Sequence, residues 1–137
     1  MKTLHPAYRV TDKAASLKFY SALGYVEVGR VELGKGASLT LIKFPGEKEA
    51  TLELVHRPGD QPVDVGTGFS HLAVQVDDLA ATLEAMSQSG LSPGPAERPG
   101  GPEGPQTAWI VDPDGYRIEL VQWPRGHPDG ITDADFD

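Results

Sequence analysis

Apolar and polar residues follow a pattern along this chain that occurs twice. Segments 4–10 and 70–76 mix the two kinds of residue as half-buried strands do, and a stretch with helical spacing follows each. Three further strands are expected after each helix, at 25–32, 38–44 and 51–56 in the first half and at 91–97, 107–111 and 117–123 in the second. The pattern predicts the element order βαβββ twice, which is an α+β fold.

Both predicted helices have recognisable ends. Asp12 or the threonine before it can cap the first helix, and Asp78 or the aspartate before it can cap the second. Gly24 and Gly90 follow the last turns, where glycine commonly ends a helix. Each helix has one apolar stripe, so both are expected to be packing elements.

Shifting the chain by 66 positions brings its two halves into register without an insertion. The matching residues include His5 with His71, Val10 with Val76, Asp12 with Asp78, Gly24 with Gly90, and Leu52-Glu53-Leu54-Val55 with Ile118-Glu119-Leu120-Val121. We therefore expect one domain over 1–124, built of modules at about 1–57 and 69–124 that a polar linker, 58–68, joins. The acidic tail, 125–137, has little to bury and is expected to be flexible.

The repeat places the same two ionisable residues in each module. These are His5 with Glu53 and His71 with Glu119, and 48 residues separate the members of each pair. Each glutamate has apolar neighbours on both sides, so the alternation of a strand turns it away from them. A lone histidine or glutamate in a strand is usually a surface group, but chance rarely produces a symmetric set of four. Two imidazoles and two carboxylates suit one divalent ion such as Ni²⁺, Zn²⁺ or Co²⁺.

Other candidates have weaker support. Arg9 stands four residues after His5, on the same side of the predicted strand, and could offer a planar fork to a substrate carboxylate. A surface ion pair is the competing interpretation of Arg9. His56 and His127 are expected to be surface groups, and the proline- and glycine-rich stretch 93–104 is either a flap over a site or a simple connection.

The composition excludes several classes of function. The formal net charge is −8 and no basic run offsets it, so nucleic acid is not expected as a partner. Cysteine is absent, which excludes disulfides, thiolate metal ligands and cysteine nucleophiles. Neither a signal-peptide core nor an apolar run of about eighteen residues occurs, so we expect no membrane association and a cytoplasmic location.

Several blocks resemble the glyoxalase I (lactoylglutathione lyase) family of the vicinal-oxygen-chelate superfamily, which also contains bleomycin-resistance proteins and dioxygenases. The resemblance runs from about Met1 to Trp123. It rests on Leu4-His5 with Arg9-Val10, Ser16 to Tyr20, Leu52-Glu53-Leu54, Ser70 to Val74, and Asp112-Pro113-Asp114-Gly115-Tyr116-Arg117-Ile118-Glu119-Leu120. The order His, Glu, His, Glu at the metal-facing positions is similar to that of bacterial glyoxalase I.

The resemblance implies that the modules form a cupped mixed sheet in a homodimer whose sites lie at the subunit interface. It also implies a lyase that detoxifies methylglyoxal, converting its hemithioacetal with a small thiol to an S-2-hydroxyacylthiol through an enediolate. One divalent metal would support this chemistry. By the same resemblance Glu119 is the base that moves the proton, and Glu53 is its partner across the metal.

The family pattern also indicates where the thiol binds. Arg9 matches a position that contacts the carboxylates of glutathione, whereas Arg57 stands where asparagine is usual, and a lysine usual before the final hairpin has no counterpart in 100–106. The thiol could therefore be glutathione or another small thiol, or the substrate could lack a thiol. Two rival functions are another metal-dependent enzyme of the same fold, an epimerase or a dioxygenase, and a metal-free protein that sequesters a ligand.

Overall fold

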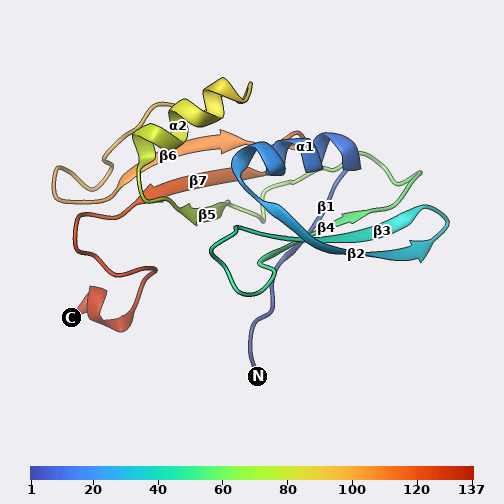
Figure 1. Ribbon diagram of the computed structural model, residues 1–137, viewed down its shortest axis with the longest axis horizontal. Helices are drawn as coiled ribbons and strands as arrows, with labels where there is room; N and C mark the ends of the chain where they lie inside the picture. The colour runs from blue at the N-terminus through green and yellow to red at the C-terminus, as the bar shows by residue number, and fades with distance from the viewer. The chain divides into compact units, whose positions relative to one another are not determined.

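The structure is a computed structural model that describes residues 1–137 and contains two α-helices (Figure 1). Each helix is preceded by an aspartate that the sequence predicts as its cap. The side chain of Asp12 accepts a hydrogen bond from the N–H of Ala15 at 3.0 Å and caps α1 (Lys13–Leu23). Asp78 caps α2 (Leu79–Gln88) in the same way, accepting from Ala81 at 3.0 Å. Gly24 ends α1 with a φ of 117°, which glycine adopts without strain.

The first of two units comprises residues 1–68 with 112–115 and holds a four-stranded sheet. Its strands lie in the order β1-β4-β3-β2. Their bounds are β1 Ala7–Arg9, β2 Val26–Gly34, β3 Ala37–Lys43 and β4 Leu52–His56. Strand β1 is parallel to β4 and the other pairs are antiparallel, so the sheet is mixed. Buried side chains of α1 and of the sheet form the core of this unit, among them Tyr8, Phe19, Tyr20, Ile42, Leu52 and Leu54.

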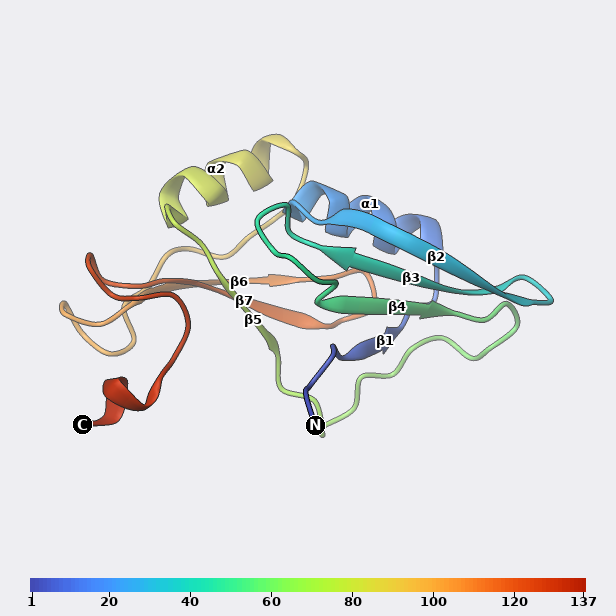
Figure 2. The same cartoon turned by 60° about the horizontal axis from the view of Figure 1, so that its bottom comes forward.

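The second unit comprises residues 69–111 with 116–137 and holds a three-stranded sheet in the order β5-β7-β6 (Figure 2). The strands are β5 Leu72–Gln75, β6 Gln106–Val111 and β7 Arg117–Gln122, and β5 is parallel to β7. Helix α2 buries Leu79 and Met86, and a 3₁₀ helix, η1 (Asp133–Phe136), lies near the C-terminus. The predicted α+β class is confirmed, with one mixed sheet in each unit. No helix of the structure has the length and apolar character needed to cross a membrane.

The strand predicted at 91–97 does not form. Glu97 makes only an isolated bridge with Thr107, and the N–H of Gly94 donates to the carbonyl of Trp109 at 2.7 Å. Pro93 and Pro95 have no N–H, so they cannot continue a ladder of hydrogen bonds along β6. The second unit therefore has the element order βαββ, and the prediction of βαβββ holds only for the first.

The two candidate histidines precede the strands on which the sequence placed them. Strand β1 begins at Ala7 and β5 at Leu72, so His5 and His71 lie just outside. Before β1 the reason is Pro6, which cannot donate to the ladder although its carbonyl accepts from the N–H of Glu53 at 3.1 Å. The start of β5 at Leu72 differs from the predicted start by two residues, which is the usual uncertainty of a strand end.

The turn Asp112–Gly115 joins β6 to β7 but belongs to the first unit, which the repeat does not predict. The hydroxyl of Tyr20 donates to the carboxylate of Asp112 at 2.8 Å, and both side chains are buried. The carboxylate of Asp114 accepts from the N–H of Thr11 at 3.1 Å. Burial, with the neighbouring Asp112 carboxylate, raises the pKa of Tyr20 well above its ordinary value, so the hydroxyl stays a donor at physiological pH.

Replacing Tyr20 by phenylalanine is expected to lower the free energy of unfolding by about 1–3 kcal/mol, because Asp112 then loses a donor while it stays buried. Urea denaturation at neutral pH measures the loss. Tyr25→Phe is the matched control, since Tyr25 is a buried tyrosine of the same core that makes no hydrogen bond with Asp112. Equal losses in the two variants would contradict the assigned role of the Tyr20 hydroxyl.

Candidate metal-binding site

In the first unit, the parallel pairing of β1 with β4 brings His5 to Glu53. Ala7 is the register partner of Glu53, and His5 lies two residues before Ala7. The Nε2 atom of His5 lies 2.9 Å from Oε2 of Glu53, and both side chains are 18% exposed. Leu52 and Leu54 beside the glutamate are almost fully buried, so Glu53 faces away from the core, as predicted.

The second unit repeats this arrangement in the same register. Ala73 pairs with Glu119, and His71 again lies two residues earlier. Nε2 of His71 is 3.3 Å from Oε2 of Glu119, with side-chain exposures of 32% and 21%. Each unit therefore presents one imidazole nitrogen and one carboxylate oxygen side by side, partly open to solvent.

The ring of His71 has two further contacts that His5 lacks. Its Nδ1 atom lies 2.7 Å from the hydroxyl of Ser70, so the hydroxyl can fix the tautomer of the ring. Trp109 meets the ring edge to face, with centroids 5.0 Å apart, and the guanidinium of Arg117 lies 4.3 Å from the centre of the Trp109 ring. The residue equivalent to Ser70 in the first unit is Leu4, which offers no hydrogen bond. The two pairs are thus alike in geometry and different in support.

The donor atoms of both pairs fit a divalent metal. Imidazole nitrogen and carboxylate oxygen are ligands that Zn²⁺, Ni²⁺ and Co²⁺ accept, and in each pair they lie close together. No group of three or more His, Cys, Asp or Glu side chains is arranged to hold a metal ion in this chain. Each pair therefore supplies two ligands, and a four-ligand site requires both pairs.

The two arginines predicted to bind substrate lie at the linker of the first unit. Arg9 donates from Nη2 to the carbonyl of Gln61 at 2.8 Å, and Nη2 lies 3.6 Å from a carboxylate oxygen of Asp60. Arg57 is exposed, and its backbone carbonyl accepts from the N–H of Asp60 at 3.3 Å. The ion-pair interpretation of Arg9 therefore agrees with this structure, while contact of Arg9 and Arg57 with a substrate stays a prediction.

A cavity beside the first pair was not predicted. Its volume is about 230 Å³, and it is lined by residues 2–5 with Glu49 and Ala50, so His5 forms part of its wall. An ion pair between Lys2 and Glu49, 3.0 Å long, lies at this cavity. The repeat gave no indication of this ion pair, because the residues that correspond to Lys2 and Glu49 in the second half are both glycine. A larger cavity of about 340 Å³, between α1 and strands β2 and β3, is lined by none of the candidate ligands.

Neither His56 nor His127 is the plain surface group that the sequence suggests. His56 is partly buried, and its Nδ1 atom is enclosed without a hydrogen-bond partner. His127 stacks on Trp123, and each of its ring nitrogens has an oxygen partner. The stacking of His127 has one possible signal in the sequence. An aromatic residue, Trp123, stands at the position that Arg57 occupies in the first half of the repeat.

Comparison with known proteins identifies the family of this chain. The family model of the glyoxalase/bleomycin resistance protein/dioxygenase superfamily matches residues 2–120. A probable lactoylglutathione lyase of Vibrio parahaemolyticus is 37% identical over 127 residues, which cover 88% of this chain and 90% of that protein. The lactoylglutathione lyase of Haemophilus influenzae is 36% identical over 128 residues, covering 89% and 93%.

Solved structures show the same fold. Glyoxalase I from Zea mays superposes with a TM-score of 0.79 at 28% identity; the match covers 88% of this chain but only 44% of the maize chain. The trypanothione-dependent glyoxalase I of Leishmania major gives a TM-score of 0.73 at 26% identity, with coverage of 89% and 86%. The resemblance inferred from the sequence blocks is confirmed by these matches.

Proposed function

Because this chain belongs to the glyoxalase/bleomycin resistance protein/dioxygenase superfamily, we propose that it is a glyoxalase I-type lyase acting on the hemithioacetal of methylglyoxal and a small thiol. The observation that carries the proposal is the His–Glu contact that recurs in both units, at 2.9 Å and 3.3 Å. A sequestering protein without metal would need neither pair. The names of the curated relatives support the same reaction class.

The metal would be held by His5, Glu53, His71 and Glu119, in a cytoplasmic homodimer whose sites draw on both chains. Bound there, a Ni²⁺, Zn²⁺ or Co²⁺ ion would polarise the two neighbouring oxygens of the substrate. With its Nδ1 engaged by Ser70, the ring of His71 keeps Nε2 for a ligand.

The proton transfer is assigned to Glu119. Its carboxylate takes the proton from the carbon that carries sulfur and returns it to the neighbouring carbonyl carbon, which becomes the hydroxyl-bearing carbon of the thioester product. Ile118 and Leu120 are fully buried on one face of β7. Glu119 lies between them and therefore faces the opposite, partly exposed side of the strand. Glu53 is the corresponding carboxylate of the other pair.

Arg9 and Arg57 would orient the thiol part of the substrate. A guanidinium can bind a carboxylate through two parallel hydrogen bonds. Arg9 lies on β1, which pairs with β4, and Arg57 directly follows β4. Arg9 would have to exchange the Gln61 carbonyl and the Asp60 carboxylate for that of the substrate. The identity of the thiol is then set by how many carboxylates these two cations can bind.

Metal binding is the first prediction of this proposal. Equilibrium dialysis of stripped protein should show tight binding of Ni²⁺ or Zn²⁺. His5→Ala and His71→Ala should each weaken it by more than the roughly 10- to 100-fold that loss of an outer-shell partner costs. His127→Phe is the matched control, because it removes a histidine and leaves both pairs intact. Equal affinity in all four proteins would exclude the proposed site.

Glu119→Gln should lower kcat/KM for hemithioacetals by about 10²- to 10⁴-fold, the range that a general base contributes, while reducing metal affinity less than His71→Ala. Thioester formation measured with several thiols gives the rates, and Glu53→Gln provides the comparison. Near-normal turnover in Glu119→Gln would refute the assignment of the base. Iron dependence with oxygen uptake would identify a dioxygenase instead.

Ser70 should act as a positioning residue for His71. We expect Ser70→Ala to weaken metal binding by roughly tenfold, and Ser70→Thr to restore most of it, because threonine keeps the hydroxyl at Nδ1. Leu4→Ala is the control at the equivalent position of the first unit. Competition with a chelator measures the affinities, and a loss in Ser70→Ala no larger than in Leu4→Ala would rule out this role.

A further inference from the structure

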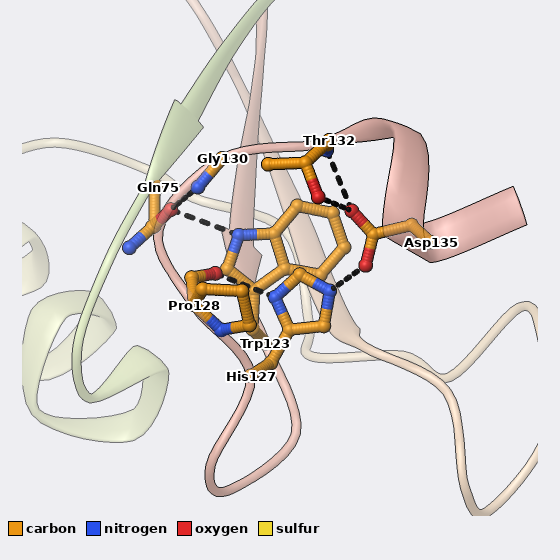
Figure 3. A network of polar contacts seen from close by, with 7 residues as sticks. All are labelled: Gln75, Trp123, His127, Pro128, Gly130, Thr132 and Asp135. Carbon is orange, nitrogen blue, oxygen red and sulfur yellow. Dashed lines mark hydrogen bonds and ion pairs between the residues drawn. The ribbon is translucent and has the colours of Figure 1, made fainter.

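The C-terminal tail, residues 123–137, is tied to β5 through the side chain of Gln75 (Figure 3). The amide oxygen of Gln75 accepts from the indole N–H of Trp123 at 2.8 Å and from the backbone N–H of Gly130 at 2.9 Å. Its amide nitrogen donates to the carboxylate of Asp129 at 2.6 Å. One side chain thus holds three points of the tail.

This attachment lies on the face of the second sheet that carries Glu119. Ala73 is paired with Glu119 and Gln75 with Val121, and directly opposed residues share a face. Trp123 follows the last residue of β7, and its indole N–H reaches the side chain of Gln75. In the repeat, Gln75 corresponds to Arg9 and Trp123 to Arg57. The tail therefore occupies, in the second unit, the positions that match those of the two arginines in the first.

His127 closes the network, and its geometry requires a particular protonation state. The ring stacks on Trp123 with centroids 4.5 Å apart and planes at 19°. Nδ1 lies 2.6 Å from the carbonyl oxygen of Pro128, and Nε2 lies 2.7 Å from a carboxylate oxygen of Asp135. Both partners are acceptors, so both nitrogens must carry a proton, and only the imidazolium form does. The neutral ring would turn one lone pair toward an oxygen.

The carboxylate beside His127 is held in its ionised form. The backbone N–H of Thr132, with the hydrogen bond from His127, holds the pKa of Asp135 below its ordinary value, so this carboxylate stays ionised until the pH falls through that lowered value. The other charged groups of the tail are Arg125, Asp129, Asp133 and Asp137, which carry a net negative charge. Strand β5 brings only the neutral Gln75 to this network, and Trp123, which follows β7, is neutral as well.

We propose that residues 123–137 form a pH-dependent clasp over the face of β5 and β7 that carries Glu119, closed while His127 is an imidazolium ion and released when it is neutral. Closure covers Gln75 and so restricts one end of that face. Loss of the His127 proton opens the clasp and exposes that end. The clasp stands on contacts within the second unit and does not depend on the proposed reaction.

Nuclear magnetic resonance of the whole, ¹⁵N-labelled chain tests the clasp without an activity assay. The two indole N–H signals report on Trp123 and on Trp109. We expect the Trp123 signal to shift with pH in the wild type and to stay fixed in His127→Phe, whereas the Trp109 signal, whose ring contacts His71, should behave alike in both proteins. Order parameters of the Gly130 and Asp135 amides should fall from roughly 0.85 at about pH 5.5 to under about 0.6 at about pH 8.5.

Two variants separate the clasp from a general effect of pH. His127→Phe keeps a ring to stack on Trp123 but has no proton to lose, so the difference between the two pH values should vanish. Gln75→Ala removes the attachment, so the tail should be mobile at both. The proposal is overturned if the order parameters of the wild-type tail do not change with pH, if the tail is mobile throughout, or if His127→Phe shows the same transition.

Discussion

Parallel pairing of the first and last strands in each unit places a histidine beside a glutamate, and the candidate site depends on it. Parallel neighbours require a crossover connection, which here includes a helix and at least one further strand. The registers Ala7 to Glu53 and Ala73 to Glu119 are equivalent in the repeat, so two residues 48 positions apart meet in the same way twice. A slip of one residue would turn each glutamate into the core.

The two units use this shared frame differently. The residue four positions after each histidine, Arg9 or Gln75, binds the segment that follows its own module. In the first unit that segment is the linker and the bond involves a cation, which a charged substrate group can compete for. In the second unit it is the C-terminal tail, held by a neutral amide that makes three hydrogen bonds with it. Equivalent positions of the repeat thus bind the following segment through a cation in the first unit and through a neutral amide in the second.

Local signals predicted most of the fold. The capping aspartates, the glycine after α1 and the alternation around Glu53 and Glu119 act over a few residues, so sequence alone reveals them. The repeat predicted which histidine meets which glutamate, because duplication preserves register. It failed at 91–97, where Pro93 and Pro95 interrupt the ladder that the first module forms. The contacts of His127 and Asp112 join residues far apart or in a polar tail, where no periodicity exists to indicate them.

The placement of the Asp112–Gly115 turn in the first unit makes the two halves interdependent. A fragment that ends at residue 68 would retain every strand of its sheet, yet it would lack the carboxylates that accept from Tyr20 and from the N–H of Thr11. In such a fragment the hydroxyl of Tyr20 would stay buried without its acceptor, so the first module by itself should be less stable than the same module within the whole chain.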